Sequence, residues 1–280
     1  MTTYAASTTS IAQPVSEHSR LRDAATDVGT MVGRSLRLVR RDPDELIMAL
    51  VLPISIMLLF VYVFGGAVQV GVDYITYATP GVLLLCAGYG ASNTAVTICQ
   101  DMTGGAMDRF RSLPILSWSV IAGHVIASVL KNLITSAIVL AVAVAIGFRP
   151  TAGVLGWLGA IGMITAYVVA ITCVAAFIGV SVRSVAAASG FGFFMLFLPY
   201  VSSAFVPPST MPSWMRGFAE HQPITPVIET IRGLLVGMGS DAAPVTGLGS
   251  TAGLALLWCA GIIAVFGIAA GWKFGRAGRG

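Results

Sequence analysis

Few residues of this chain have the types and spacing that catalysis or metal binding requires. His18, His124 and His221 lie far apart in the sequence, and none has a partner at metal-ligand spacing. Ser189-Gly190 approaches the sequence around a serine nucleophile, for which His124 would have to act as the base. We keep an intramembrane protease as an alternative, but predict a non-enzyme with no catalytic, metal or cofactor site.

The chain also lacks the residues that are typical of an ATP-binding protein or of an ion-coupled carrier. No G-x-x-x-x-G-K-[ST] motif occurs, so ATP cannot bind through a P-loop. The long apolar stretches hold no Asp or Glu, which a gradient-driven carrier is expected to carry within the membrane. Any work that the protein performs is therefore expected to be driven by a separate ATPase, with a gradient-driven carrier as the weaker alternative.

The composition is typical of an integral membrane protein. Of 280 residues, 56% are hydrophobic and only 10% are charged, whereas soluble domains carry about 25% charged residues. The net charge of +4 comes from scattered basic residues that form no patch for nucleic acid. The cysteines all lie in apolar stretches without a C-x-x-C pair and are predicted to be buried thiols: Cys86, Cys99, Cys173 and Cys259.

Six apolar stretches are each long enough for one membrane-spanning helix. We expect these helices near residues 46–66, 76–99, 121–147, 155–180, 186–206 and 252–273. On one side of the membrane the connections carry only Arg149, Arg216 and Arg232, and most other Lys and Arg residues fall on the opposite side. The positive-inside rule then places both termini in the cytoplasm. The predicted fold class is an all-α, multi-pass protein of the cytoplasmic membrane.

Lys131 lies in the third predicted span. At the bilayer centre its charge would cost about 2.5–3.5 kcal/mol. Because residues 132–148 still supply about 25 Å of helix, we expect the ammonium group to reach the cytoplasmic interface. A contact with cargo or a pairing with a neighbouring helix is the alternative.

A basic amphipathic helix is predicted in the arm that precedes the first span. Between residues 27 and 43, apolar side chains recur at helical spacing while Arg34, Arg37 and Arg41 project elsewhere, and Asp42-Pro43 ends the pattern. Such a helix lies in the membrane interface, as a plain anchor or as a sensor of a cytoplasmic partner's movements. Residues 1–26 are predicted to be a flexible cytoplasmic terminus, and 27–275 the transmembrane domain.

The loop between the second and third spans has features of a docking segment. Met107, Phe110 and Arg111 lie at positions i, i+3 and i+4 of a possible short helix, which Pro114 would stop. A short cytoplasmic helix that carries both Phe and Arg suits a groove on another protein. Among the remaining residues of this loop we single out Asp101, Gly105, Arg109 and Leu113.

Between the fifth and sixth spans, residues 205–239 predict two short helices that rest on or dip into the outer leaflet. Pro212 and Trp214 mark the first of them, and Pro223 begins the second. In the second helix an apolar face lies opposite Glu229 and Arg232. These short outer re-entrant helices would cap a path through the membrane.

Two of these segments resemble the permeases of type-2 ABC transporters, particularly the daunorubicin-resistance-like drug and lipid exporters. The loop with Asp101, Gly105, Arg109 and Leu113-Pro114 is similar to the family's acidic–Gly–Arg–Leu-Pro coupling segment. The outer motifs are similar as well: Met211-Pro212-Ser213-Trp214, Gln222-Pro223-Ile224-Thr225 and Arg232-Gly233-Leu234-Leu235. With the six-span plan, the resemblance covers roughly residues 30–275.

The resemblance implies the permease subunit of an ATP-driven exporter of a hydrophobic or amphipathic molecule, a drug or a lipid. The loop would be the coupling helix that fits an ATPase subunit, on which ATP and Mg would bind. Two permease chains, as a homodimer or heterodimer, would work with two ATPase copies in the lipid bilayer. The alternative within the same class is a polysaccharide or glycolipid export permease.

Overall fold

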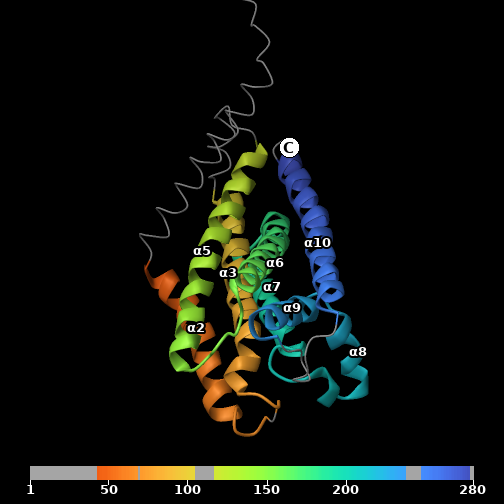
Figure 1. Ribbon diagram of the computed structural model, residues 1–280. Helices are drawn as coiled ribbons and strands as arrows, with labels where there is room; N and C mark the ends of the chain where they lie inside the picture. Colours follow the sequence, from red (N-terminus) through yellow and green to blue (C-terminus); the bar gives the residue numbers. More distant parts are fainter. Residues whose placement is uncertain (1–42, 69, 105–116, 238–246, 278–280) are drawn as a thin grey trace, which may run out of the picture.

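In the computed structural model, residues 43–68, 70–104, 117–237 and 247–277 are described, and they form helices and turns without any strand (Figure 1). Eight α-helices occur over these ranges. The all-α class predicted from the sequence is therefore confirmed.

Five helices of the described chain are long and apolar enough to cross a membrane. They are α2 (Pro43–Leu58) with its π-helical continuation η1 (Leu59–Phe64), α3 (Tyr74–Thr103), α5 (Ser117–Ile146), α6 (Val154–Ser181) and α10 (Leu248–Ala277). Within lipid, a segment must satisfy its own backbone hydrogen bonds, and long apolar runs do so as helices. These five helices correspond to the first, second, third, fourth and sixth predicted spans.

The fifth predicted span is shorter than expected. It forms α7 (Val185–Phe197) and continues as the 3₁₀ turn η2 (Leu198–Val201), so it ends five residues before the predicted boundary at 206. There the Ser202 hydroxyl donates to the Pro199 carbonyl and accepts from the amide of Ala204. Such local side-chain bonds replace helical ones and end the element. The number of spans stays a prediction.

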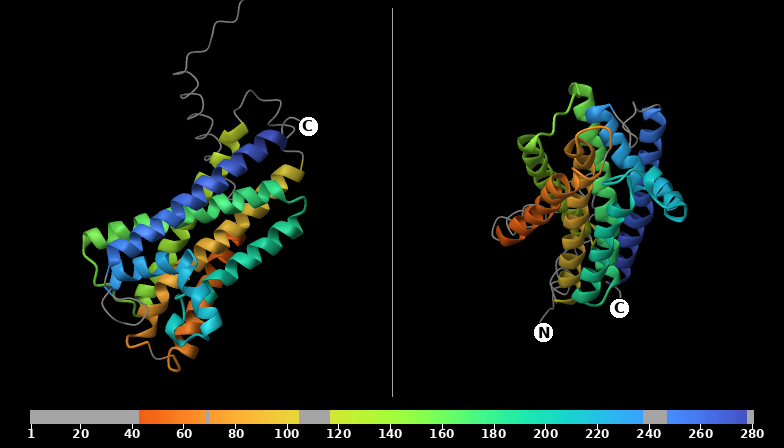
Figure 2. Two further views of the ribbon diagram at one scale, coloured as in Figure 1. Left: turned by 90° about the vertical axis from the view of Figure 1, so that its right-hand side faces the viewer. Right: turned by 90° about the horizontal axis from the view of Figure 1, so that it is seen from below.

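Helix α3 is the centre of the bundle, with α5, α6 and α7 packed around it (Figure 2). Small residues allow the helices to approach closely. A Cβ atom on Gly90 of α3 would overlap the Asn132 side chain of α5, and one on Gly192 of α7 would overlap Ser92 of α3. Small residues at helix contacts are typical of membrane bundles, where van der Waals packing drives association.

Two short helices precede α10, as predicted. They are α8 (Ser213–His221), which follows the 3₁₀ turn η3 (Pro208–Thr210), and α9 (Ile224–Val236). Both lie toward the end of the bundle opposite the C-terminal end of α10 (Figure 1). Helix α9 is largely buried against α3, α6 and α10, whereas α8 is peripheral and exposes Trp214 and Phe218.

Two predictions about the second and third spans need correction. Helix α3 continues four residues beyond the predicted boundary, to Thr103, so Asp101 lies in a helix and not in a loop. Lys131 is 8% exposed, so its side chain lies among the helices and not on the surface of the bundle. The burial favours pairing with neighbouring groups over the predicted reach to the interface. The four cysteines are buried, as predicted.

Candidate functional site

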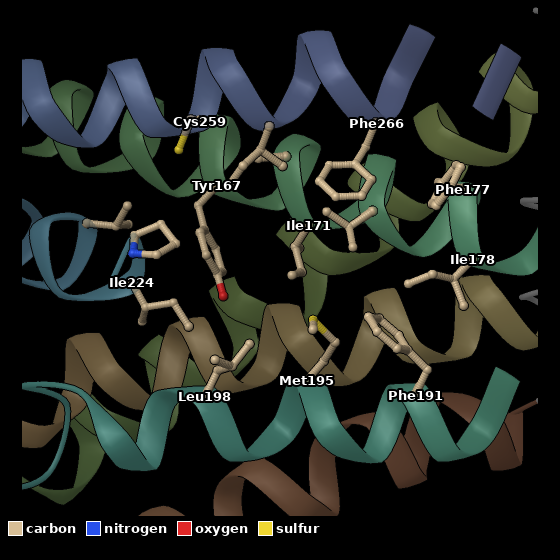
Figure 3. Close-up of a pocket in the computed structure, with 15 residues that line it drawn as sticks. Tyr167, Ile171, Phe177, Ile178, Phe191, Met195, Leu198, Ile224, Cys259 and Phe266 are labelled. Carbon is tan, nitrogen blue, oxygen red and sulfur yellow. The ribbon is translucent and has the colours of Figure 1, made fainter. Parts of the chain in front are cut away.

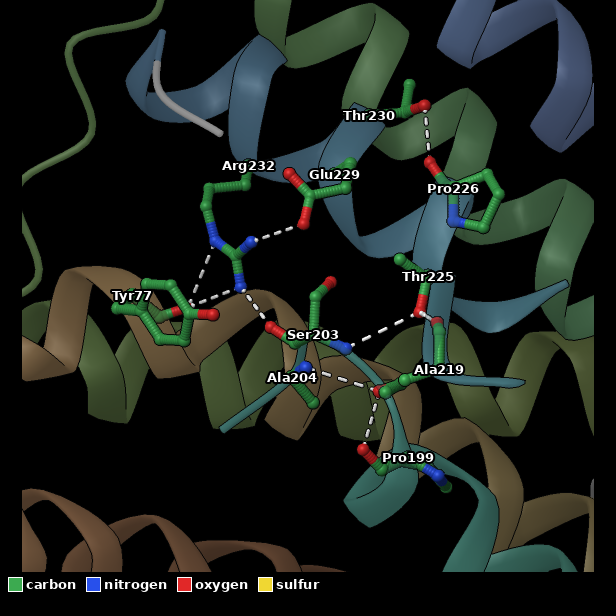
Figure 4. Close-up of polar contacts among 11 residues, drawn as sticks. Tyr77, Pro199, Ser203, Ala204, Ala219, Thr225, Pro226, Glu229, Thr230 and Arg232 are labelled. Atoms are coloured by element: carbon green, nitrogen blue, oxygen red, sulfur yellow. Dashed lines mark hydrogen bonds and ion pairs between the residues drawn. The ribbon is translucent and has the colours of Figure 1, made fainter. Parts of the chain in front are cut away.

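Arg232 of α9 is a buried charge held by partners from three parts of the chain (Figure 4). Its side chain is 2% exposed, and its Nη1 atom lies 2.9 Å from Oε1 of Glu229. Its Nη2 donates to the carbonyl oxygens of Ser203 at 2.7 Å and of Tyr77 at 3.1 Å. The guanidinium carbon lies 4.0 Å from the centroid of the Tyr77 ring.

A buried charge is costly unless it is paired and hydrogen-bonded, and Arg232 satisfies this condition with an acid, two carbonyls and an aromatic face. The network therefore fixes α9 to α3 and to the segment that follows η2, residues 202–206. That segment has further bonds: the Tyr74 hydroxyl donates to the Phe205 carbonyl at 2.9 Å. A Cβ atom on Gly81 of α3 would lie 2.5 Å from the Cβ atom of Ala204, so only glycine allows this approach.

An apolar cavity of about 370 Å³ lies between α6, α7, α9 and α10 (Figure 3). Phe191 and Met195 of α7 face Phe266 of α10 across it, and side chains of α6 such as Tyr167 and Ile171 line it between them. The Tyr167 hydroxyl of α6 points into the cavity (Figure 3). Ligand cavities in proteins measure about 300–1,000 Å³ and combine apolar walls with a few polar groups. This cavity suits a molecule that is mostly apolar.

At the other end of α3, an acid and a histidine connect two helices. Nε2 of His124 on α5 lies 3.0 Å from Oδ2 of Asp101 on α3, and both side chains are partly buried. Beside this pair, apolar residues of α3, α5, α6 and α10 form one cluster around Ile98, Ile121 and Phe274. Asp101 and His124 thus join the two helices between which residues 105–116 run in the sequence.

Most of the residues predicted to contact a partner lie outside the described part of the chain. They are Arg34, Arg37, Arg41, Gly105, Met107, Arg109, Phe110, Arg111, Leu113 and Pro114. What was predicted for them stays a prediction.

The predicted residues of the outer helices are only partly brought together. Pro212 precedes α8, and Trp214 of α8 is 76% exposed. Pro223 precedes α9 and lines the apolar cavity. Glu229 and Arg232 were predicted to lie opposite the apolar face of this helix. Arg232 is nonetheless buried, because α9 is surrounded by other helices and the guanidinium group points inward.

The partners of Arg232 and the polar group of the cavity were not predicted from the sequence. Tyr77 and Ser203 contribute backbone carbonyls, which every residue has, so their types carried no signal. Tyr167 is one tyrosine in a long apolar stretch. A usable signal did exist for the ion pair, since Glu229 and Arg232 are spaced i, i+3 in an otherwise apolar helix.

The two residues of the protease alternative have separate partners. The Ser189 hydroxyl donates to the Val185 carbonyl within α7, at 3.0 Å. His124 contacts Asp101 of α3, and no bond between His124 and Ser189 occurs in the described part of the chain. A nucleophile and its base are recognised by their mutual hydrogen bond, so this alternative gains no support.

Comparison with known proteins agrees with this architecture. The family model described as "ABC-2 type transporter" matches residues 26–236. Over 239 residues, the chain is 28% identical to the daunorubicin resistance ABC transporter permease protein DrrB1 of Streptomyces coeruleorubidus, with 85% of this chain and 82% of that protein covered. It is 26% identical over 239 residues to the probable doxorubicin resistance ABC transporter permease protein DrrC of Mycobacterium tuberculosis (strain CDC 1551 / Oshkosh), with coverage of 85% and 84%.

The matched region holds the Arg232 network and the α6, α7 and α9 walls of the cavity. Since the family model matches more than half of the chain, and since five described helices are long and apolar enough to cross a membrane, this multi-pass membrane permease belongs to the ABC-2 type transporter family.

Proposed function

We propose that this chain is the permease subunit of an ATP-driven exporter that moves a hydrophobic or amphipathic molecule, a drug or a lipid, across the cytoplasmic membrane. The observation that carries the proposal is the cavity between α6, α7, α9 and α10, whose walls are apolar except for the Tyr167 hydroxyl. Two relatives are named for resistance to daunorubicin and doxorubicin, which supports a drug-like cargo. A polysaccharide would need many hydrogen-bond partners, which such walls do not offer.

The energy is supplied by a separate ABC ATPase, on which ATP and Mg bind. It docks at the end of the bundle where residues 105–116 connect α3 to α5, and the Asp101–His124 contact passes its movement to both helices. Coupling of this kind is a two-state rearrangement of packed helices. Two permease chains, identical or different, work with two ATPase copies.

In the membrane, α7 and η2 form the fifth of six spans, and both termini face the cytoplasm. Supporting this arrangement, α8 and α9 lie toward the end of the bundle opposite the C-terminal end of α10, which carries Lys273 and Arg276 (Figure 1). Helices α8 and α9 are then on the outer side, and the basic arm before α2 lies in the cytoplasmic interface.

Inverted membrane vesicles that contain the chain and its ATPase provide the test. We expect ATP-dependent uptake of a fluorescent amphipathic probe, and loss of both uptake and ATPase co-purification in an Arg109→Glu/Phe110→Ala double variant. Arg183→Glu/Phe193→Ala is the matched control, since both residues are exposed and lie outside the loop. Transport by the chain alone on a proton or sodium gradient would overturn the proposal.

A further inference from the structure

A second cavity, of about 530 Å³, lies between the C-terminal parts of α6 and α10. Its walls include Phe177, Trp272, Lys273 and Arg276. Nζ of Lys273 lies 5.6 Å from the centroid of the Phe177 ring, and the guanidinium carbon of Arg276 lies 3.8 Å from the centroid of the Trp272 ring. Over the described ranges neither cation forms an ion pair with a carboxylate. Within the described part of the chain, the positive charge of this cavity is therefore not compensated by a carboxylate, and it lies beside aromatic walls.

The basic cavity and the apolar cavity share a wall. Phe177 lines both, and it contacts Phe266 of α10 edge to face at 5.5 Å between centroids. From Phe177, the apolar cavity extends along α6 to Tyr167, ten residues earlier and so about 15 Å away along the helix. A basic compartment and a long apolar compartment therefore follow one another along the same two helices.

We propose that the two cavities form one binding site for an anionic amphiphile. The acidic headgroup lies between Lys273 and Arg276, and the apolar part passes Phe177 into the cavity beside Tyr167. Basic pockets between membrane helices bind acidic lipid headgroups through this charge complementarity. A neutral or cationic headgroup would leave both charges uncompensated. If the bound amphiphile is cargo, the site names the class of molecule that is exported. Only this identification of the amphiphile as cargo rests on the proposed function, and the binding site itself does not.

The binding test uses the purified full chain in detergent, without an ATPase. Phosphatidylglycerol and phosphatidylcholine with the same acyl chains are the probes, and native mass spectrometry counts the bound lipid. We expect phosphatidylglycerol to bind more tightly, and Lys273→Gln or Arg276→Gln to weaken its binding about fivefold each without affecting phosphatidylcholine. Lys273→Arg should retain binding.

Arg183→Gln is the matched control, because Arg183 is exposed, follows α6 at the same end of the bundle and loses the same charge. We expect it to leave phosphatidylglycerol binding unchanged. An equal loss in Arg183→Gln, or no loss in the Lys273 and Arg276 variants, would mean that general surface charge governs binding, and the site would be rejected.

Substitutions in two walls of the apolar cavity test whether it holds the apolar part of the amphiphile. Val174→Trp on α6 and Met195→Trp on α7 each fill the cavity with a larger ring. Both should reduce phosphatidylglycerol binding while the variants keep a single symmetric peak in gel filtration. Unchanged binding in both variants would overturn the placement of the apolar part.

Transport then distinguishes a cargo from a resident membrane lipid. In vesicles with the ATPase, Lys273→Gln should abolish ATP-driven movement of a fluorescent phosphatidylglycerol if the amphiphile is cargo. If movement persists although binding is lost, the bound amphiphile is a resident lipid. Both results are compatible with the binding site, because only the binding measurements can overturn it. Failure of the binding-site proposal is therefore distinguishable from failure of the proposed export function.

Discussion

Arg232 places a positive charge inside an apolar bundle, and its partners come from α9, from α3 and from the segment after η2. Glu229 neutralises the charge from the preceding turn of α9, and the carbonyls of Tyr77 and Ser203 complete the coordination from α3 and from the segment after η2. Removal of the arginine would leave Glu229, whose side chain is 15% exposed, without its cation. The loss therefore includes the cost of an uncompensated acid and not only the lost contacts.

Replacing Arg232 with Met should destabilise the protein by about 3–5 kcal/mol, the cost of breaking a buried ion pair from one side. The Arg232→Met/Glu229→Gln double variant should recover part of this loss, because the orphaned charge is gone. Thermal unfolding in detergent measures the effect. Arg216→Met on α8 is the control: Arg216 is exposed, its guanidinium group bonds to the carbonyls of Pro208 and Ser209, and its loss should cost under about 1 kcal/mol. Equal effects of the two substitutions would contradict the role given to Arg232.

At the scale of elements, α3 approaches the segment after η2 more closely than a side chain allows. The Gly81→Ala variant would place a Cβ atom 2.5 Å from that of Ala204, and one of the two backbones must shift. We expect a destabilisation of about 1–3 kcal/mol from this overpacking. The matched control is Gly162→Ala on α6, where a Cβ atom meets nothing within 4 Å. That variant should be neutral or gain up to about 1 kcal/mol of helix propensity. The reverse order in a thermal unfolding series would refute the contact.

The contact between α3 and α5 at the other end is tested by a double-mutant cycle. Asp101→Ala, His124→Ala and the double variant should show a coupling free energy of about 0.5–3 kcal/mol, as residues in direct contact do. The cycle is measured as unfolding free energy in detergent at one fixed pH. Losses that add within about 0.3 kcal/mol would mean that the two helices are not linked through this pair.

The sequence predicted the elements better than their ends and their surroundings. Long apolar runs were sufficient to predict the long helices, because a backbone surrounded by lipid must satisfy its own hydrogen bonds and does so as a helix. The ends depended on local side-chain bonds, such as that of Ser202, which composition does not reveal. The burial of Arg232 could not be predicted for a related reason: periodicity separates apolar from polar faces, but it does not say that Arg232 finds carbonyl acceptors inside the bundle. The cavity needed four helices at once and had no sequence signal.

At the scale of the whole molecule, the number of membrane spans depends on whether α7 crosses the membrane. Its 13 residues and the four of η2 give about 27 Å, close to the roughly 30 Å hydrocarbon core. If the helix crosses, the residues on either side of it lie in different compartments. If it does not, Arg183 and Glu220 lie on the same side, and the termini of the described chain lie on opposite sides of the membrane.

Cysteine labelling in intact cells separates the two cases. Arg183 and Glu220 are both exposed, whereas the four natural cysteines are buried and should give little background. With six spans, a membrane-impermeant maleimide should label Glu220→Cys from outside, and Arg183→Cys only after the cells are permeabilised. Because Arg183 is a basic residue of the predicted cytoplasmic side, the same result supports the positive-inside orientation. Equal labelling of both variants in intact cells would place the ends of α7 and η2 in one compartment, and the chain would then cross the membrane five times.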